Sequence, residues 1–135
     1  MTQVVNLRHF FQIKTSWRIY ELHKGKHLLI DCVDVPYEIC INDKLVMNAL
    51  SKAVVRAGAT ILSTSRHHLG HNSPPGFALV ICLDESHCSA HSYAEEGKIA
   101  MDVFTCGNTN PEDVLKFVLE EIDLGTVKLT KVERF

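Results

Sequence analysis

The sequence predicts an α+β fold, a two-layer sandwich in which a largely antiparallel sheet carries its helices on one face. Strand-like segments follow one another through short connections, which favours antiparallel neighbours, and two other segments have helical spacing of apolar residues. The runs at 28–33 and 77–83 are too apolar for a solvated sheet face. We therefore expect a second copy to cover the open face by sheet packing, giving a homodimer with a four-layer αββα arrangement.

The first part of the chain is expected to supply an extension, a strand and a helix. Residues 1–25 carry scattered aromatic residues in a partly alternating pattern and are interpreted as an N-terminal extension, either an arm or an extra strand. Residues 28–33 form a predicted strand. Apolar residues then recur at helical spacing, with Asn42 or Asp43 as the cap and Gly58 just past the helix end.

The next elements are predicted to be strands separated by a long loop. Residues 60–65 alternate enough for a strand, and residues 66–76 have the composition of a turn-rich loop. A buried strand is expected at 77–83 and a further strand at 99–104.

A second helix and a last strand complete the prediction. Asn110 and Pro111 form a cap followed by a proline at the first helical position, and the two carboxylates after them suit the positive end of the helix dipole. Gly125 ends this helix, and residues 127–132 alternate as a strand.

Composition limits the function classes. With 135 residues, 46% hydrophobic and 22% charged, the chain is expected to form one domain. The net charge of −2 and the absence of a basic stripe argue against a nucleic-acid partner. The sequence contains neither an 18-residue apolar run nor a signal-peptide pattern, so we expect a cytoplasmic protein that does not enter a membrane.

The cysteines also suit a reducing compartment. There are five, without CxxC spacing, which argues against a disulfide framework and a zinc ribbon. Most lie in apolar runs, where a cysteine is usually a small hydrophobe, but Cys106 is followed at once by glycine.

The segment Asp84-Glu85-Ser86-His87, with His91 and Cys106 further on, has residue types that can cut the backbone. A serine can attack the preceding carbonyl carbon and convert the amide to an ester. Removal of the serine α-proton by a base such as His91 then expels the upstream carboxylate, and the resulting dehydroalanine hydrolyses to a pyruvoyl group. On spacing alone, the alternative is structural: Ser86 and His87 in a turn, and Cys106 a core thiol.

Four blocks give the sequence a specific resemblance. They are Lys26-His27-Leu28-Leu29-Ile30-Asp31, Ala57-Gly58-Ala59-Thr60-Ile61-Leu62, Glu85 to Glu95 (ESHCSAHSYAE) and Met101-Asp102-Val103-Phe104-Thr105-Cys106-Gly107. In this order and spacing the chain resembles the short prokaryotic S-adenosylmethionine decarboxylases, which are made as proenzymes.

The resemblance implies a pyruvoyl-dependent decarboxylase domain at residues 26–135. It implies self-cleavage between Glu85 and Ser86 into a beta chain of residues 1–85 and an alpha chain of residues 86–135. Ser86 would become the pyruvoyl group, which forms a Schiff base with S-adenosylmethionine, and the product would serve spermidine synthesis. His91 would be the processing base and Cys106 the proton donor in catalysis. The family forms homodimers with active sites between protomers.

The resemblance also implies a substrate site. Glu95 would accept hydrogen bonds from the ribose hydroxyls, and Tyr93 would offer a smaller aromatic face to the adenine than the usual tryptophan. An aromatic residue expected in the upstream loop is missing, and histidines stand there, of which His68 is the candidate for substrate contact. Ala78 replaces a serine that assists processing in the family.

These departures keep alternatives open. The chain could decarboxylate ornithine or arginine, or it could be a regulatory relative that does not cleave. The histidines at 67, 68, 71, 87 and 91 could bind a metal or lie in a solvated loop, although we expect no metal site. His27 is interpreted as a structural residue.

Overall fold

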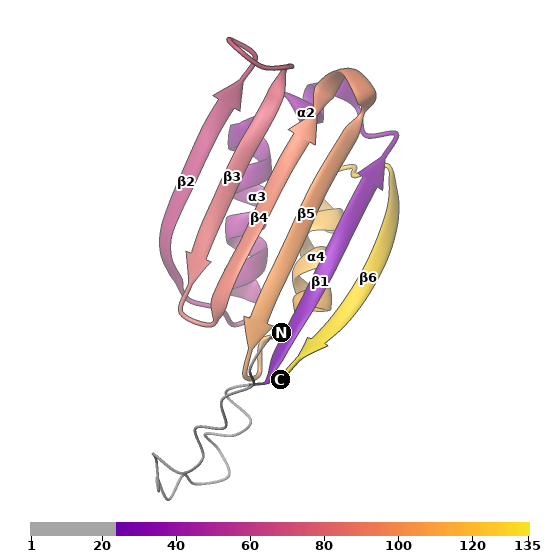
Figure 1. Ribbon diagram of the computed structural model, residues 1–135. Coiled ribbons are helices and arrows are strands. Elements are labelled where there is room, and N and C mark those ends of the chain that lie inside the picture. Colours follow the sequence, from indigo (N-terminus) through magenta and orange to yellow (C-terminus); the bar gives the residue numbers. More distant parts are fainter. Residues whose placement is uncertain (1–23) are drawn as a thin grey trace, which may run out of the picture.

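One six-stranded sheet forms the first layer of the structure, a computed structural model that describes residues 24–135. The strands are β1 Gly25–Val33, β2 Ile61–Leu69, β3 Gly76–Leu83, β4 Ser86–Tyr93, β5 Lys98–Cys106 and β6 Thr126–Arg134. Their spatial order is β2-β3-β4-β5-β1-β6, and every neighbouring pair is antiparallel (Figure 1). The predicted antiparallel sheet is confirmed. The arm or extra strand expected within residues 1–25 falls almost wholly outside the described residues.

Helices form the second layer. They are α2 Tyr37–Cys40, α3 Asp43–Arg56, the 3-10 helix η2 Ala94–Glu96 and α4 Pro111–Glu121. The Asn42 side chain caps α3 by accepting a hydrogen bond from the Leu45 N–H (3.0 Å), and Asn110 caps α4 in the same way through the Glu112 N–H (3.0 Å). Both long helices lie behind the same face of the sheet in Figure 1, which confirms the two-layer α+β sandwich.

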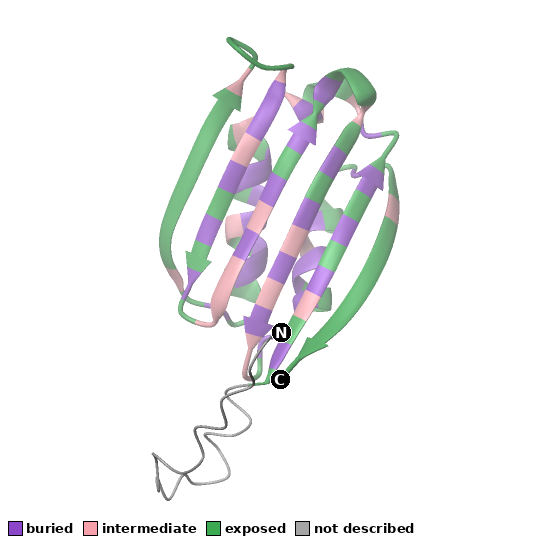
Figure 2. Ribbon diagram, viewed as in Figure 1, coloured by how far each residue is buried: buried purple, intermediate pink, exposed green. Residues whose placement is uncertain are grey.

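The core lies between the sheet and the helices. Along β1, for example, Leu28, Ile30 and Cys32 are buried while the residues between them are not, and Figure 2 shows this alternation on the central strands. Burial raises the pKa of the Cys32 thiol to about 11 and that of Cys88 to about 12. Both thiols therefore stay protonated at neutral pH and act as small apolar groups.

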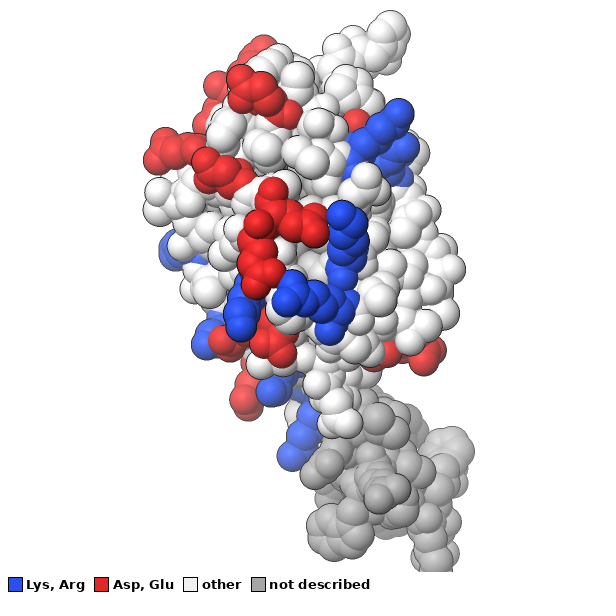
Figure 3. Space-filling view, turned by 180° about the vertical axis from the view of Figure 1, so that it is seen from behind, with Lys and Arg blue, Asp and Glu red and all other residues white. Residues whose placement is uncertain are grey.

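The two faces of the molecule differ in charge. Acidic and basic side chains gather over the helices (Figure 3), where Arg56 pairs with Glu120 at 2.6 Å and Lys52 lies 3.7 Å from Glu121, both between α3 and α4. The face of the sheet opposite the helices is called the outer face below. Its positions on β2, β3 and β4 carry no Asp, Glu, Lys or Arg, and Val80 there is 48% exposed.

The structure corrects the prediction at two strands. β4 was not predicted: its inward positions hold the small residues Cys88, Ala90 and Ser92, and its outward positions hold serine, histidine and tyrosine, so no apolar alternation marks it. β2 extends to Leu69, through residues predicted as loop, because it is an edge strand whose side chains are mostly exposed and polar. Within residues 24–135, no helix has the length and apolar character that crossing a membrane requires.

Candidate functional site

The β3–β4 hairpin presents the Glu85–Ser86 peptide bond at its tip. Leu83 pairs with Ser86, so Asp84 and Glu85 form the turn between the strands. The tip is tied to Thr60, whose carbonyl accepts from the Asp84 N–H (2.9 Å) and whose N–H donates to Glu85 Oε2 (2.9 Å). Ser86 has a φ of 148°, a value that favours glycine and costs a residue with a side chain about 1–3 kcal/mol. The bond predicted to be cut therefore precedes a strained residue, and Thr60 fixes the turn in front of that residue.

The Glu85 carbonyl oxygen accepts two hydrogen bonds from one residue. The backbone N–H of Cys106 donates to it at 3.1 Å, and the Cys106 Sγ lies 2.9 Å from the same oxygen. Cys106 reaches it because Thr105 pairs with Ser86 across β4 and β5. The buried hydroxyl of Thr105, the residue before Cys106, donates to the Thr109 carbonyl at 2.7 Å and so stabilises the turn that follows β5. Two donors on one carbonyl oxygen stabilise the negative charge that forms there when a nucleophile attacks the carbon.

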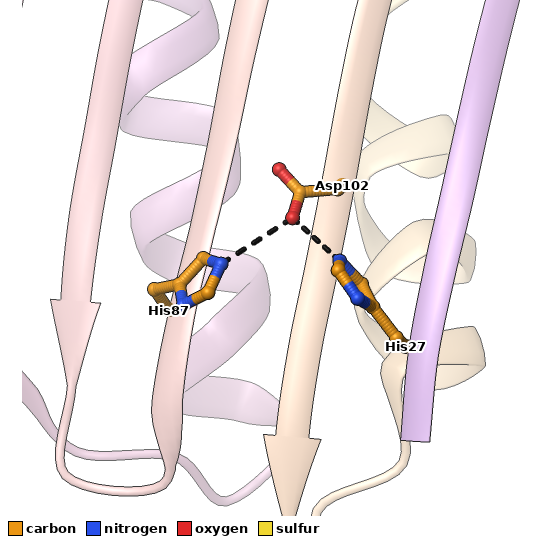
Figure 4. A group of neighbouring side chains, drawn as sticks. All are labelled: His27, His87 and Asp102. Carbon is orange, nitrogen blue, oxygen red and sulfur yellow. Dashed lines mark hydrogen bonds and ion pairs between the residues drawn. The ribbon is translucent and has the colours of Figure 1, made fainter. Parts of the chain in front are cut away.

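A cluster of His27, His87 and Asp102 lies beside Ser86 on the outer face (Figure 4). His87 Nδ1 lies 3.2 Å from Ser86 Oγ, and His87 Nε2 lies 3.4 Å from Asp102 Oδ2. His27 Nε2 lies 2.7 Å from the same Asp102 oxygen, and the Ser89 hydroxyl donates to the other one, Oδ1. Three strands, β1, β4 and β5, thus converge on one carboxylate.

The sequence prediction missed this cluster. His27 was interpreted as structural, Asp102 was given no role, and the strand that carries His87 was not predicted. Register was the missing information, because His27 and Asp102 are 75 residues apart in the chain and meet only through the pairing of β1 with β5. A signal was present in the sequence, since all three residues fall within the blocks that carry the resemblance.

The cluster has the residue types of a metal site, but its shortest contact is a hydrogen bond between His27 and Asp102. Among the described residues, His27, His87 and Asp102 offer ligand atoms within 4.8 Å of one another. The 2.7 Å separation of His27 and Asp102 is ordinary for a charge-assisted hydrogen bond. The alternative metal cluster of loop histidines is not assembled, because His67 and His68 are neighbours on β2 and point to opposite faces of the sheet.

His91, Tyr93 and Glu95 gather at the other end of β4. The rings of His91 and Tyr93 are 4.9 Å apart on the outer face, and Glu95 follows in the exposed η2 turn. His91 is five residues beyond Ser86 on the same strand, so their Cα atoms are about 16 Å apart. Within one chain, then, the structure does not bring these three residues to the Glu85–Ser86 bond. Ala78 pairs with His91 in the adjacent strand, so a serine there would stand beside this imidazole.

His68, the predicted substrate contact, does not lie with Tyr93. It pairs with the buried Phe77 and so points to the helix side, where its Nδ1 is 3.7 Å from Asp43 Oδ1. Burial alone would raise the pKa of Asp43, but the hydrogen bond and charge of Arg66, together with His68, hold it below its ordinary value. His68 therefore lies with Asp43 and Arg66 near the start of α3. Its neighbour His67 shares the outer face with His91, and Ala78 of β3 lies between the two.

Comparison with known proteins shows one consistent likeness. A family model described as S-adenosylmethionine decarboxylase matches residues 26–135. The S-adenosylmethionine decarboxylase proenzyme of Moorella thermoacetica is 35% identical over 111 residues, which are 82% of this chain and 86% of that protein. The proenzyme of Methanococcus aeolicus is 34% identical over 113 residues, covering 83% and 94%. The crystal structure of the adenosylmethionine decarboxylase from Aquifex aeolicus superposes with a TM-score of 0.72 at 25% identity, covering 82% of this chain and 89% of that one.

Proposed function

The chain belongs to the S-adenosylmethionine decarboxylase family, and on this premise we propose that it cuts its own Glu85–Ser86 bond and then decarboxylates S-adenosylmethionine. The product would be the aminopropyl donor for spermidine synthesis. One observation carries the proposal: the carbonyl that Ser86 would attack precedes a strained residue and accepts two hydrogen bonds from Cys106. We expect the enzyme to act in the cytoplasm, where its thiols stay reduced.

Self-cleavage begins with attack of Ser86 Oγ on the Glu85 carbonyl carbon. The C–O bond forms while the two Cys106 donors hold the oxygen that becomes negative. The C–N bond then breaks, the nitrogen of Ser86 takes up a proton, and an ester replaces the amide. Relief of the positive φ at Ser86 favours this direction. In the second step a base removes the α-proton of residue 86, and the Cβ–O bond breaks to release the Glu85 carboxylate.

The residues fit a pyruvoyl group made from Ser86. Such a group supplies a carbonyl that captures the substrate amine and accepts the electron pair when carbon dioxide leaves. Once Glu85 is no longer bonded to residue 86, the Cys106 thiol would lose this carbonyl partner while staying close to residue 86. It is half-buried at a strand end, unlike the buried thiols of Cys32 and Cys88, and we assign it the return of a proton to the substrate.

We further propose that a second copy completes the site. His91, Tyr93 and Glu95 are too far along β4 to act on Ser86 of their own chain. The outer face that carries His91 and Tyr93 is low in charge over three strands and exposes Val80 and Tyr93. Packing two such faces together would bring His91 of one protomer to the α-proton of the other. Glu95 would then bind the ribose and Tyr93 the adenine. Of the histidines in the upstream segment, His67 would contact the substrate, because it lies on the same outer face.

Intact mass spectrometry of the purified chain tests the cleavage. We expect two fragments, residues 1–85 and 86–135, and a single uncut chain would rule the proposal out. Ser86→Ala should remain uncut because it lacks the nucleophile, whereas Ser51→Ala on α3 serves as the matched control and should cleave normally.

Substrate choice is tested separately on the cleaved protein. Carbon dioxide should be released from carboxyl-labelled S-adenosylmethionine and not from ornithine or arginine. Release from either amino acid, with none from S-adenosylmethionine, would replace this substrate while leaving the cleavage proposal intact.

A further inference from the structure

We propose that His87 is the base that removes the Ser86 hydroxyl proton in the first step of self-cleavage. Asp102 and His27 hold the His87 imidazole in the tautomer and orientation that this step requires. This inference rests on the proposed self-cleavage and assigns its first step to residues that the sequence left without a catalytic role. It separates that step from the second, in which the partner's copy of His91 acts on the α-proton.

Contact with the reacting atom is the first argument. His87 Nδ1 lies 3.2 Å from Ser86 Oγ, within the reach needed for proton transfer. His91 is about 16 Å further along the same strand, so within one chain it cannot serve this hydroxyl. Both His87 and Cys106 are neighbours of the Glu85–Ser86 bond, which places a base at the nucleophile and two donors at the carbonyl oxygen.

The orientation of the imidazole is the second argument. For Nδ1 to accept the hydroxyl proton, the ring must carry its hydrogen on Nε2. Asp102 Oδ2 lies 3.4 Å from Nε2 and, as an ionised carboxylate, offers only acceptors to it. The arrangement therefore favours the tautomer with a free Nδ1, and the negative charge stabilises the imidazolium formed when the proton arrives.

The carboxylate is itself held in place. His27 Nε2 contacts Asp102 Oδ2 at 2.7 Å, and the Ser89 hydroxyl donates to Oδ1. The Phe104 ring packs against both imidazoles, with centroid distances of 5.0 Å to His27 and 5.6 Å to His87. The side chains of His27 and Asp102 are only 17% and 18% exposed, so this support is largely shielded from water even in one chain.

The proton balance closes within the site. His87 takes the proton from Ser86 Oγ as the new C–O bond forms, and returns it to the Ser86 nitrogen as the C–N bond breaks. The step consumes no external acid, base or oxidant, and it ends with a neutral His87, an ester and a free α-amine.

Hydroxylamine distinguishes the two steps, because it cleaves an ester rapidly and leaves an amide intact. We expect His87→Ala to slow the loss of uncut chain about 10²–10⁴-fold and to leave material that hydroxylamine does not cut. His91→Ala should also remain uncut on a denaturing gel but should accumulate the ester, which hydroxylamine splits after Glu85. His71→Ala, in the β2–β3 loop, is the matched histidine control.

Two outcomes would overturn the assignment. One is cleavage of His87→Ala at the wild-type rate. The other is a His87→Ala product that hydroxylamine splits, which would place His87 in the second step. If the wild-type chain itself were never cut, the proposed function would fail instead, so the two failures are distinguishable.

Asp102→Asn tests the positioning role without removing the base. The amide can donate a hydrogen bond to Nε2 and so favour the wrong tautomer, which should slow the first step by at least ~10-fold. Because Asp102 would act only through His87, the double variant His87→Ala/Asp102→Asn should be no slower than His87→Ala alone. The positioning role would be contradicted if the two substitutions slowed cleavage multiplicatively in the double variant, or if Asp102→Asn cleaved at the wild-type rate. Thermal unfolding of each variant confirms that the fold is retained.

Discussion

Cys106 contacts the carbonyl oxygen of the Glu85–Ser86 bond, so the proposed cleavage would give this residue a part in processing as well as in turnover. Its N–H and its thiol share one oxygen, so the side chain can be altered while the backbone donor stays. The residue predicted from the sequence as a proton donor thus also contacts the bond that we propose is cut.

We expect Cys106→Ala to slow self-cleavage by about 10- to 100-fold, less than the loss of a strong oxyanion donor because the S–H group is a weak donor. Cys106→Ser keeps an O–H donor and should cleave faster than the alanine variant, yet its hydroxyl is a poor acid and decarboxylation should fall. The rate of fragment appearance by intact mass, followed by carbon dioxide release, separates the two roles. Equal cleavage rates for wild type and Cys106→Ala would show that the thiol contact does not contribute to self-cleavage.

At the scale of elements, the β3–β4 hairpin explains both the success and the failure of the sequence prediction. The resemblance carried by four sequence blocks, and not spacing alone, predicted Glu85, Ser86 and Cys106 as site residues, and the structure brings these three together. β4 itself was not predicted, because its inward side chains are small and its outward side chains are polar. Without β4 there was no register between β4 and β5, and without register His87 and Asp102 could not be placed side by side. His68 was predicted as a substrate contact in a loop, since β2 was predicted to end at residue 65, whereas the structure places it in β2 on the helix side of the sheet.

The connection from α4 to β6 depends on Gly125. This glycine has a φ of 64°, and a Cβ there would lie 2.2 Å from the Val33 carbonyl oxygen at the end of β1. Gly125→Ala must therefore displace backbone, and we expect a loss of at least about 2 kcal/mol in the free energy of unfolding. Gly58 is the control, because it has a φ of 96° but no atom within 4 Å of the added Cβ.

Urea unfolding, performed in the uncut Ser86→Ala background, measures both glycine substitutions. Gly58→Ala should cost only the strain of its φ, about 1–2 kcal/mol. If Gly125→Ala were no more destabilising than Gly58→Ala, the close approach to β1 would have no energetic weight.

At the scale of the whole molecule, the residues of the proposed site form two groups at opposite ends of β4. Ser86, His87 and Cys106 lie at one end, and His91 and Tyr93 lie toward the other. A two-fold pairing of outer faces, with the strands of the two sheets running in opposite directions, would match the first half of each chain's site with the second half of its partner's.

Complementation between two inactive variants tests this pairing. Chains carrying Ser86→Ala and His91→Ala, expressed together, form one complete site in the mixed dimer, composed of Ser86 from the second chain and His91 from the first. We expect only the His91→Ala chain to be cut, and to no more than the fraction present in mixed dimers. If neither chain is cut when mixed dimers are present, His91 does not act across the interface.

The position of β1 between β5 and β6 has a consequence for the molecule after the cut. Cleavage after Glu85 would assign β1, β2 and β3 to one polypeptide and β4, β5 and β6 to the other. The sheet would then alternate between the two products, because β1 is hydrogen-bonded on both sides to strands of the other polypeptide and β3 to β4. Separating the two polypeptides would require breaking the backbone hydrogen bonds of three strand pairs, so they should remain associated without any covalent link.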